Sequence, residues 1–461
     1  MGEQSKKVLM VYCYAAATQG KLRNVGGAHP PIGLLYAAAA VEREGHQVRV
    51  SDELVNDNTE QMIDEFKPDV LCLSVNTPCV PRAKALVEYG RAHGVSTFIA
   101  GGAHAVNEPQ SCVSDVGVDA AVMNEGEIVL PDLVNKKDWS KIKGITYKDK
   151  KGKITNNGKR ELIEDLDAIA FPARHLIDFS KYAGTAELGF FLHKNEKWTP
   201  VITSRGCPYL CTFCANWRVM GRNTRDRSPE NVVAELKEIK NKYGINAVVF
   251  LDDTFTLRPE RVKKICELML QENLDMKWSC QTRVNVSKEL LELMKKAGCQ
   301  LVAFGVESGS NKVLNIVKKG TNINQVKQAF KISREVGLRR KAYFVVGLPG
   351  EEKEDFEMSV RLAKEISPEY LWVSKFAPVP GSEYYEKNKE NLKDMKWEDY
   401  GYFNGKNTEE VEQRHRQLVR SYYLRPTYMV NFLKRFSWVE CAYMFKMFKS
   451  FMGMGGGHEE A

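Results

Sequence analysis

The sequence lacks any uncharged apolar run of about 18 residues, the length that a helix needs to cross a membrane. It also lacks a secretory signal, so the 11 cysteines are expected to be reduced thiols or metal ligands rather than disulfides. Neither sign of charge dominates, because 67 basic minus 59 acidic residues leave only +8, which does not indicate a nucleic-acid partner. A cytoplasmic protein of two or three domains is therefore expected from the 461 residues.

A second pair of closely spaced cysteines is missing near the one clear cysteine motif. Cys207, Cys211 and Cys214 stand at C-x3-C-x2-C spacing after a strand-like run at 198–203. A structural zinc site needs four ligands, usually from two paired motifs. Three thiolates on one short loop can instead hold three irons of a [4Fe–4S] cluster and leave the fourth iron open.

This loop resembles the cluster loop of the radical S-adenosylmethionine (SAM) superfamily, in which an aromatic residue precedes the third cysteine. Phe213 stands in that place, beside the metal ligands Cys207, Cys211 and Cys214. The resemblance implies that SAM binds the open iron and is cleaved to a 5′-deoxyadenosyl radical, which abstracts hydrogen from an unreactive C–H bond. It also implies an electron donor such as flavodoxin or ferredoxin.

The first 140 residues alternate short apolar runs with helical patterns. Strands are predicted at 8–14, 47–51, 69–75, 96–100 and near 119–123, and helices at 32–44, 59–66, 82–93 and 128–134. Strands that alternate with helices of this length indicate a parallel, doubly wound, flavodoxin- or Rossmann-like sheet. Ligands of such sheets bind beyond the carboxyl ends of the strands.

The polar and glycine-rich strand ends of this region resemble the cobalamin-binding domain that precedes some radical SAM domains. The resemblance rests on the Pro30–Gly33 stretch, Gly101-Gly102-x-His104 and Gly126-Glu127. The predicted cobalamin contacts are Gly33, Ser74, Asn76, Thr77, Gly101, Gly102, His104, Glu125 and Gly126. The D-x-H-x-x-G motif, whose histidine binds cobalt in many cobalamin enzymes, is absent, so the cobalt is expected to lack a histidine from that motif. For His104 the alternative is a turn histidine that hydrogen-bonds the backbone.

After a structured linker at 141–195, with a hairpin around 148–153, the βα alternation resumes at 196–385. Six strands are predicted at 199–203, 247–251, 277–281, 301–306, 340–346 and 370–376. The helices between them are predicted at 229–243, 259–272, 287–297, 323–336 and 353–366. This pattern predicts a partial (β/α)6 barrel, the fold of the superfamily that the cluster loop resembles, with its function at the carboxyl ends of the strands.

Polar side chains follow these barrel strands where each strand ends. SAM is zwitterionic and cationic, so carboxylates, a guanidinium that forks onto its carboxylate, and glycines that admit its flat base suit it. By resemblance, the second strand end holds the amino group, the fourth the ribose and carboxylate, and the last two the adenine. The predicted SAM contacts are Phe213, Asp252, Asp253, Arg283, Glu307, Ser308, Gly347, Glu351 and Phe376. For Asp253 and Glu351 the alternative is an ordinary charge at a helix start.

The C-terminal region, 386–461, is expected to be mainly helical. Between 420 and 451, six basic residues and one acidic residue interleave with aromatics. Met429, Phe432, Leu433 and Phe436 have the spacing of an apolar helix face. Such a helix can lie in a membrane interface on the inner face of the membrane, pack on the barrel or cover the substrate.

Together these features predict an α/β radical SAM enzyme that depends on a [4Fe–4S] cluster, SAM and cobalamin. The reaction favoured is methylation of an unactivated carbon in a small or lipid-like substrate. The alternatives are an oxidative cyclase or oxygenase of the anaerobic magnesium-protoporphyrin ester type, and a cobalamin sensor. A methylthiotransferase would use Cys13, Cys72 and Cys79 for a second cluster. Otherwise Cys13, Cys72 and Cys79, like Cys112, Cys266, Cys280 and Cys299, are expected to be packing residues.

Overall fold

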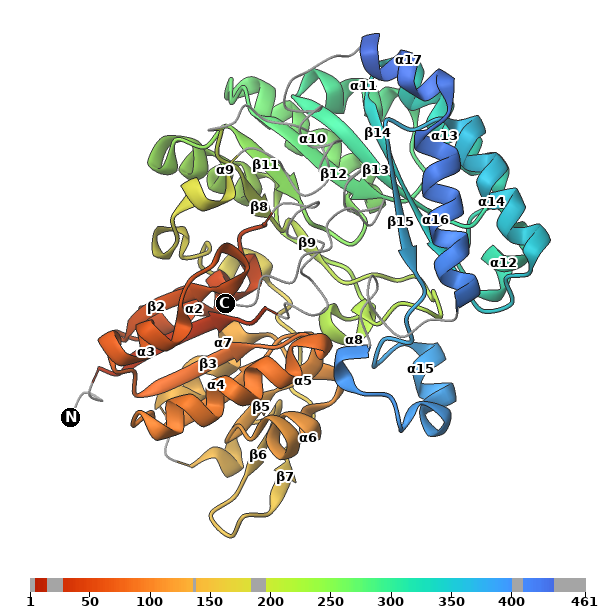
Figure 1. The fold of residues 1–461 in the computed structure, drawn as a ribbon. Helices are drawn as coiled ribbons and strands as arrows, with labels where there is room; N and C mark the ends of the chain where they lie inside the picture. The colour runs from red at the N-terminus through yellow and green to blue at the C-terminus, as the bar shows by residue number, and fades with distance from the viewer. Residues whose placement is uncertain (1–4, 15–27, 136–137, 184–195, 400–408, 435–461) are drawn as a thin grey trace.

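The structure, a computed structural model, describes residues 5–14, 28–135, 138–183, 196–399 and 409–434. Two α/β units lie side by side, and the C-terminal helices run along the outer side of the second unit (Figure 1). The α/β class and the order of its parts are confirmed.

The first unit contains a seven-stranded sheet in the order β2-β1-β3-β4-β5-β6-β7. Its parallel strands are β1 (Lys7–Tyr12), β2 (Gln47–Asp52), β3 (Val70–Ser74), β4 (Thr97–Gly101) and β5 (Ala120–Val122). The predicted hairpin is β6 (Ile145–Lys148) with β7 (Ile154–Asn156), and β6 pairs antiparallel with β5. This sheet therefore continues beyond residue 140 as far as Asn156.

Helices cover both faces of this sheet. One face packs against α2 (Ile32–Arg43) and α7 (Gly126–Asn135), the other against α3 (Thr59–Phe66) and α4 (Val80–Ala92). Side chains of β3 alternate between the two, so Cys72 joins the first core and Leu73 the second. Burial on both faces explains the nearly continuous apolar runs of its strands.

The second unit contains six parallel strands in the order β15-β14-β13-β12-β11-β8, which confirms the partial (β/α)6 barrel. The strands are β8 (Thr199–Val201), β11 (Ala247–Phe250), β12 (Lys277–Thr282), β13 (Cys299–Glu307), β14 (Arg339–Val346) and β15 (Tyr370–Lys375). The helices between them are α9 (Pro229–Tyr243), α10 (Pro259–Gln271), α11 (Lys288–Lys296), α13 (Ile323–Val336) and α14 (Lys353–Ile366). Cys266, Cys280 and Cys299 are buried in this core, as predicted.

Local sequence explains where these helices begin. The Ser228 side chain accepts a hydrogen bond from the backbone N–H of Asn231, and Pro229 opens α9. Asn322 and Gln325 form a reciprocal capping box at the start of α13. Between β8 and α9 the chain forms β9 (Ser204–Arg205), α8 (Asn216–Met220) and β10 (Arg225–Asp226), and β10 pairs with β9.

The C-terminal helices α16 (Glu409–Tyr423) and α17 (Pro426–Lys434) pack against the β15 side of the barrel (Figure 1). The buried hydroxyls of Tyr422 and Tyr423 donate to the carbonyl oxygens of Pro368 and Leu371. In α17 Tyr428 and Phe432 pack against the core, whereas Met429, predicted to share a face with Phe432, is 47% exposed. Phe436 lies outside the described residues. Of the described helices, none is long and apolar enough to span a membrane.

Candidate active site

The cluster loop begins at Gly206, directly after β9. Gly206 has a φ of +98°, and a Cβ there would lie 2.4 Å from the carbonyl oxygen of Asn223. A side chain is therefore excluded at this turn. The N–H of Cys207 donates to Gly221, and that of Thr212 donates to Val317 at 3.0 Å, so backbone hydrogen bonds hold the loop at both ends.

The three predicted cluster ligands are the thiols of this loop. Burial raises the pKa of Cys214 to about 11, and burial also raises the pKa of Cys207, with a further contribution from the neighbouring Cys211. Thiols in such surroundings need a bound metal to become thiolates. Among the described residues no three metal-binding side chains converge on a single ion. Three separated thiols suit a [4Fe–4S] cluster, because each binds a different iron.

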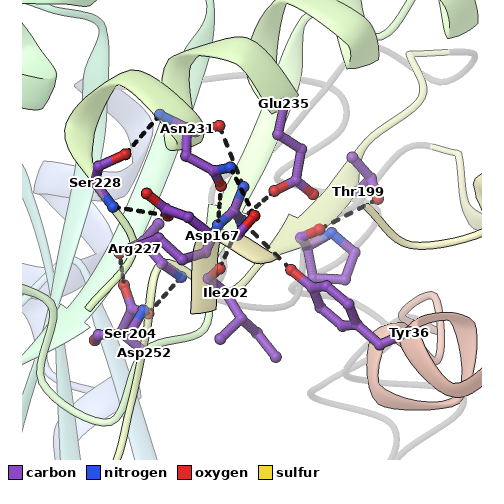
Figure 2. Close-up of polar contacts among 12 residues, drawn as sticks. Tyr36, Asp167, Thr199, Ile202, Ser204, Arg227, Ser228, Asn231, Glu235 and Asp252 are labelled. Carbon is purple, nitrogen blue, oxygen red and sulfur yellow. Dashed lines mark hydrogen bonds and ion pairs between the residues drawn. The ribbon is translucent and has the colours of Figure 1, made fainter. Parts of the chain in front are cut away.

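The two aspartates after β11 have different surroundings. The carboxylate of Asp252 is fully buried and accepts hydrogen bonds from Thr203 and from the backbone N–H of Ser204. Figure 2 shows Asp252 beside Ser204. Asp252 therefore holds the strand that leads into the cluster loop and has little capacity left for a ligand. Asp253 accepts a hydrogen bond from Asn216, but its buried Oδ2 atom has no partner in the described structure. Burial and the charge of Asp252 raise the pKa of Asp253 to about 6, and an ammonium group would suit its carboxylate.

Arg283 lies over the cluster loop from the end of β12. Its guanidinium is 3.6 Å from the centre of the Tyr209 ring, and its Nη1 is 3.8 Å from the sulfur of Cys211. The Nε and Nη2 atoms are buried and have no partner in the described structure. Two unpartnered donors on one planar guanidinium fit a carboxylate, as the SAM prediction requires.

The predicted SAM contacts at the ends of β13 and β14 are mostly engaged in hydrogen bonds and ion pairs with other residues of the protein. Glu307 has a φ of +67° and pairs with Lys319 at 2.6 Å, while Ser308 is fully buried beside the N–H of Ser310. The N–H of Gly347 donates to Glu351, which also pairs with Arg414. Burial raises the pKa of Glu351, and its Oε1 atom has no partner in the described structure.

Phe213 and Phe376 pack against one small apolar cluster. That cluster contains Val313, Val317 and Leu348 and lies beside the cluster loop. The structure thus brings together an apolar surface, the two guanidinium nitrogens of Arg283 that lack partners and the one such oxygen of Asp253, around the three cysteines. This set fits the adenine, carboxylate and amino group of SAM, respectively.

A cavity of about 290 Å³ lies between the two units, beyond the carboxyl ends of the first sheet. Six predicted cobalamin contacts line it: Gly33, Ser74, Gly101, Gly102, Glu125 and Gly126. Cβ atoms added at Gly33 or Gly101 would meet nothing within 4 Å, so the wall leaves room there for a flat ligand. From the second unit, Ile202, Arg205, Val219, Met220 and Leu251 complete the lining.

Asn76, Thr77 and His104 do not line this cavity. The His104 ring is fully buried, 3.2 Å from the hydroxyls of Thr77 and Ser111, and lies edge-on to Trp397. The ring therefore hydrogen-bonds side chains, whereas the alternative given for His104 in the sequence analysis was a turn histidine that hydrogen-bonds the backbone. Burial lowers the pKa of His104 to about 4, so the ring is neutral. Among the cavity-lining residues that the sequence analysis did not predict as contacts are Tyr12, His29 and Asn124. Tyr12 is the last residue of β1 and His29 precedes α2, and this position between the first strand and the first helix was the available signal.

Buried ion pairs join the two units around the cavity. Arg205 pairs with Glu125 at 2.7 Å and with Glu127 at 2.5 Å, and Arg225 also pairs with Glu125. Arg205 stands two residues before Cys207, so the same side chain contacts the first unit and leads into the cluster loop. Arg218 of α8 pairs instead with Glu386.

A second buried network lies further along the interface. Glu235 of α9 pairs with Arg174 at 2.6 Å and also with Arg227. Arg227 reaches the Tyr36 hydroxyl of α2 and the carbonyl of Ile202 (Figure 2). The two units are therefore joined by the Arg205 and Arg225 ion pairs with Glu125 and by the hydrogen bond from Arg227 to Tyr36.

The cysteines of the first unit do not converge. Cys13 and Cys79 lie in the core beneath α3 and α4, whereas Cys72 lies in the core beneath α2 and α7, on the opposite face of the sheet. Burial raises the pKa of the Cys13 and Cys72 thiols. One cluster cannot be held from both faces of a sheet, so this arrangement disfavours a second cluster site.

Comparison with known proteins agrees with this geometry. Residues 201–363 match the radical SAM superfamily and residues 20–134 match the B12 binding domain. An uncharacterized methyltransferase of Pyrococcus horikoshii is 31% identical over 445 residues, 92% of this chain and 95% of that protein. The anaerobic magnesium-protoporphyrin IX monomethyl ester cyclase of Rubrivivax gelatinosus is 27% identical over 82% of this chain and 70% of its own length.

A solved structure shares the fold. It is the radical S-adenosylmethionine methyltransferase from Kitasatospora setae, described with cobalamin and a [4Fe–4S] cluster bound. The two folds superpose with a TM-score of 0.68 at 18% identity, over 84% of this chain and 75% of the other.

Proposed function

Because this chain belongs to the radical SAM superfamily, in the group with a preceding B12-binding domain, we propose that it methylates an unactivated carbon of a small or lipid-like substrate. The chain is a cobalamin-dependent radical SAM enzyme whose cofactors are a [4Fe–4S] cluster, SAM and cobalamin. When bound, these groups supply a hydrogen-abstracting radical and a transferable methyl group.

The residues of the chain divide this work between the two units. Cys207, Cys211 and Cys214 would hold the cluster. Asp253 and Arg283 would bind the amino group and carboxylate of SAM through the atoms that now lack partners. Asp252 positions the cluster loop from behind, through Thr203 and Ser204.

The observation that carries the proposal is the shared cavity. Its wall contains Gly101 and Glu125 from the first unit, and Arg205 and Met220 from the segments that flank the cluster loop. A methyl donor held by the first unit and a radical source held by the second would therefore face one substrate space. Methyl transfer needs that arrangement, because both groups must reach the same carbon.

An oxidative cyclase is the second candidate, favoured by the 27% identity to the Rubrivivax enzyme over most of this chain. It would use the same cluster loop and the same SAM contacts. A methylthiotransferase is less favoured, because Cys72 lies on the opposite face of the sheet from Cys13 and Cys79.

We also propose an electron donor such as flavodoxin or ferredoxin. Leu210 lies between two of the cluster cysteines and is 52% exposed, so the cluster loop reaches the surface. Electron transfer to a cluster requires a short path from a docked donor, and this exposed loop would provide one.

The first experiment measures iron, sulfide and cobalt in anaerobically reconstituted protein. About four irons and about one cobalt per chain are expected; about eight irons without cobalt would instead fit a methylthiotransferase.

The second experiment supplies SAM with a labelled methyl group and candidate lipids and tetrapyrroles. Methyl transfer predicts that the product carries the label and that unlabelled S-adenosylhomocysteine is formed. A ring-closed or oxygenated product without label would instead support the cyclase. Absence of any SAM cleavage with dithionite would support a sensor.

A further inference from the structure

The cavity between the units is lined by several side chains that can bind a metal in principle. Glu125 and Glu127 are already paired with Arg205. The Cys72 thiol is protonated, because burial raises its pKa to about 12. These three groups are therefore poor ligands for the cobalt of cobalamin, and the imidazole of His29 is left as the strongest donor among the cavity-lining residues.

The His29 ring has an unused polar atom. Its Nδ1 is buried and has no hydrogen-bond partner within the described residues, and the ring lies edge-on to Tyr12 with 6.1 Å between ring centres. A buried polar atom without a partner destabilises the protein unless a ligand or water satisfies it. The ring therefore has coordination capacity at the wall of the cofactor cavity.

The backbone at His29 is restrained for such a role. Pro30 and Pro31 follow it directly, both are buried, and α2 begins at the next residue. A following proline restricts His29 to extended conformations, and a second proline stiffens the connection to the helix. A ligand on a rigid segment loses little conformational entropy when it binds.

A carboxylate lies near the ring. Burial raises the pKa of Asp52 to about 6, while the Tyr182 hydroxyl and the nearby His29 act in the opposite direction. Histidines that bind metals commonly have a carboxylate nearby, which orients the ring and increases its basicity. Asp52, at the end of β2 beside β1, is placed for this supporting role.

We propose that His29 binds the cobalt of cobalamin through a ring nitrogen, although it lies outside a D-x-H-x-x-G motif. The proposal rests on cobalamin binding and is independent of whether the reaction is methylation or ring closure. Asp52 is a positioning residue in this arrangement.

The test is electron paramagnetic resonance of the full-length holoprotein with its cobalamin reduced to the Co(II) state. An axial nitrogen splits each cobalt line into a triplet. The protein is prepared with ordinary histidine and with ¹⁵N-histidine, because only a protein nitrogen changes the triplets into doublets; a nitrogen from the cofactor's own base does not.

The expected result is doublets in the labelled wild type and their loss in His29→Ala, with cobalt content unchanged. His93→Gln, an exposed histidine of the same unit, is the control and keeps the doublets. Asp52→Asn is expected to weaken the splitting without abolishing cobalamin binding. Spectra that do not respond to ¹⁵N-histidine would overturn the proposal, as would doublets that persist in His29→Ala. The labelled wild type decides the question even if the alanine variant fails to fold.

Discussion

Some buried side chains beside the cluster loop have polar atoms without a hydrogen-bond partner among the described residues. Arg283 stacks on Tyr209 and leaves two guanidinium nitrogens without partners, while Asp252 in the adjacent turn is fully satisfied. The contrast distinguishes a residue that is prepared for a ligand from one that supports the loop. The two neighbouring strand ends therefore carry different functions.

Arg283→Gln should weaken SAM binding by about 10- to 100-fold, because charged hydrogen bonds contribute about 1.5–3 kcal/mol each. Equilibrium dialysis of SAM against reconstituted protein would measure the change, with iron content as the check that the cluster is retained. Arg258→Gln, an exposed arginine, is the matched control. Unchanged SAM affinity in Arg283→Gln would contradict the assigned role.

His104 should make the protein sensitive to acid. Burial lowers its pKa to about 4, so the unfolded chain binds a proton before the folded protein does. The stability that the neutral ring contributes is complete above about pH 6.5 and is lost as the pH falls towards 4, by up to about 3 kcal/mol. Urea unfolding at several pH values should show this loss in the wild type and a smaller loss in His104→Gln. An identical pH dependence in both proteins would refute the explanation.

The sequence predicts the cluster cysteines because their chemistry depends on spacing within one loop. It could not separate Asp252 from Asp253, because the difference lies in Thr203 and Ser204, about 50 residues away in the chain. His104 was misleading for a similar reason: Trp397, which contacts its ring, comes from the segment after the barrel. Local patterns show that a residue is polar, but distant residues decide what it bonds to.

At the scale of elements, α9 carries the buried carboxylate that joins the two units. Glu235→Gln should lower the free energy of unfolding by about 3–5 kcal/mol, because Arg174 and Arg227 would keep buried charges without a counter-charge. Glu238→Gln on the same helix, where the carboxylate pairs at the surface with Lys242, should change stability by less than about 0.5 kcal/mol. Chemical denaturation would compare the two, and equal effects would argue against a buried network.

The end of α16 and the outer side of α17 form an exposed apolar patch of Leu424, Met429 and Val430. Arg416 and Arg420 are exposed on the same helix pair. We expect this patch to bind anionic membranes, since apolar burial and basic residues both favour the interface. Replacing its three residues by serine should reduce co-sedimentation with anionic liposomes several-fold. Ile154→Ser, at an exposed site of the hairpin, should not, and equal binding by both variants would exclude the patch.

Helix boundaries followed from local chemistry, and α9, α13 and α14 begin and end where the sequence predicts. Caps and the apolar period are short-range signals, so they can be read without the fold. The strand that pairs with the β6–β7 hairpin could not be predicted from the sequence, because the pairing of β6 with β5 is a contact between separate segments of the chain. The cavity was also hidden, since it exists only where the two units meet.

For the whole molecule, the buried pairs across the cavity imply that the two units unfold together. Differential scanning calorimetry should show one transition, and cobalamin at about 100 times its dissociation constant should add about 2.7 kcal/mol of stability. Removal of cobalamin should shift that single transition downward without splitting it. Two separate transitions, only one of which responds to cobalamin, would contradict a joined molecule.

The pairing of Arg205 with Glu125 also constrains how such proteins can evolve and be engineered. A cobalamin unit transplanted from a relative would bring its own residue at position 125 against a foreign residue at position 205, at the entrance to the cluster loop. Functional chimeras should therefore require exchange of both positions, and the two should change together among descendants of a common ancestor. A chimera designed only by cutting the chain in the linker would therefore leave this salt bridge mismatched.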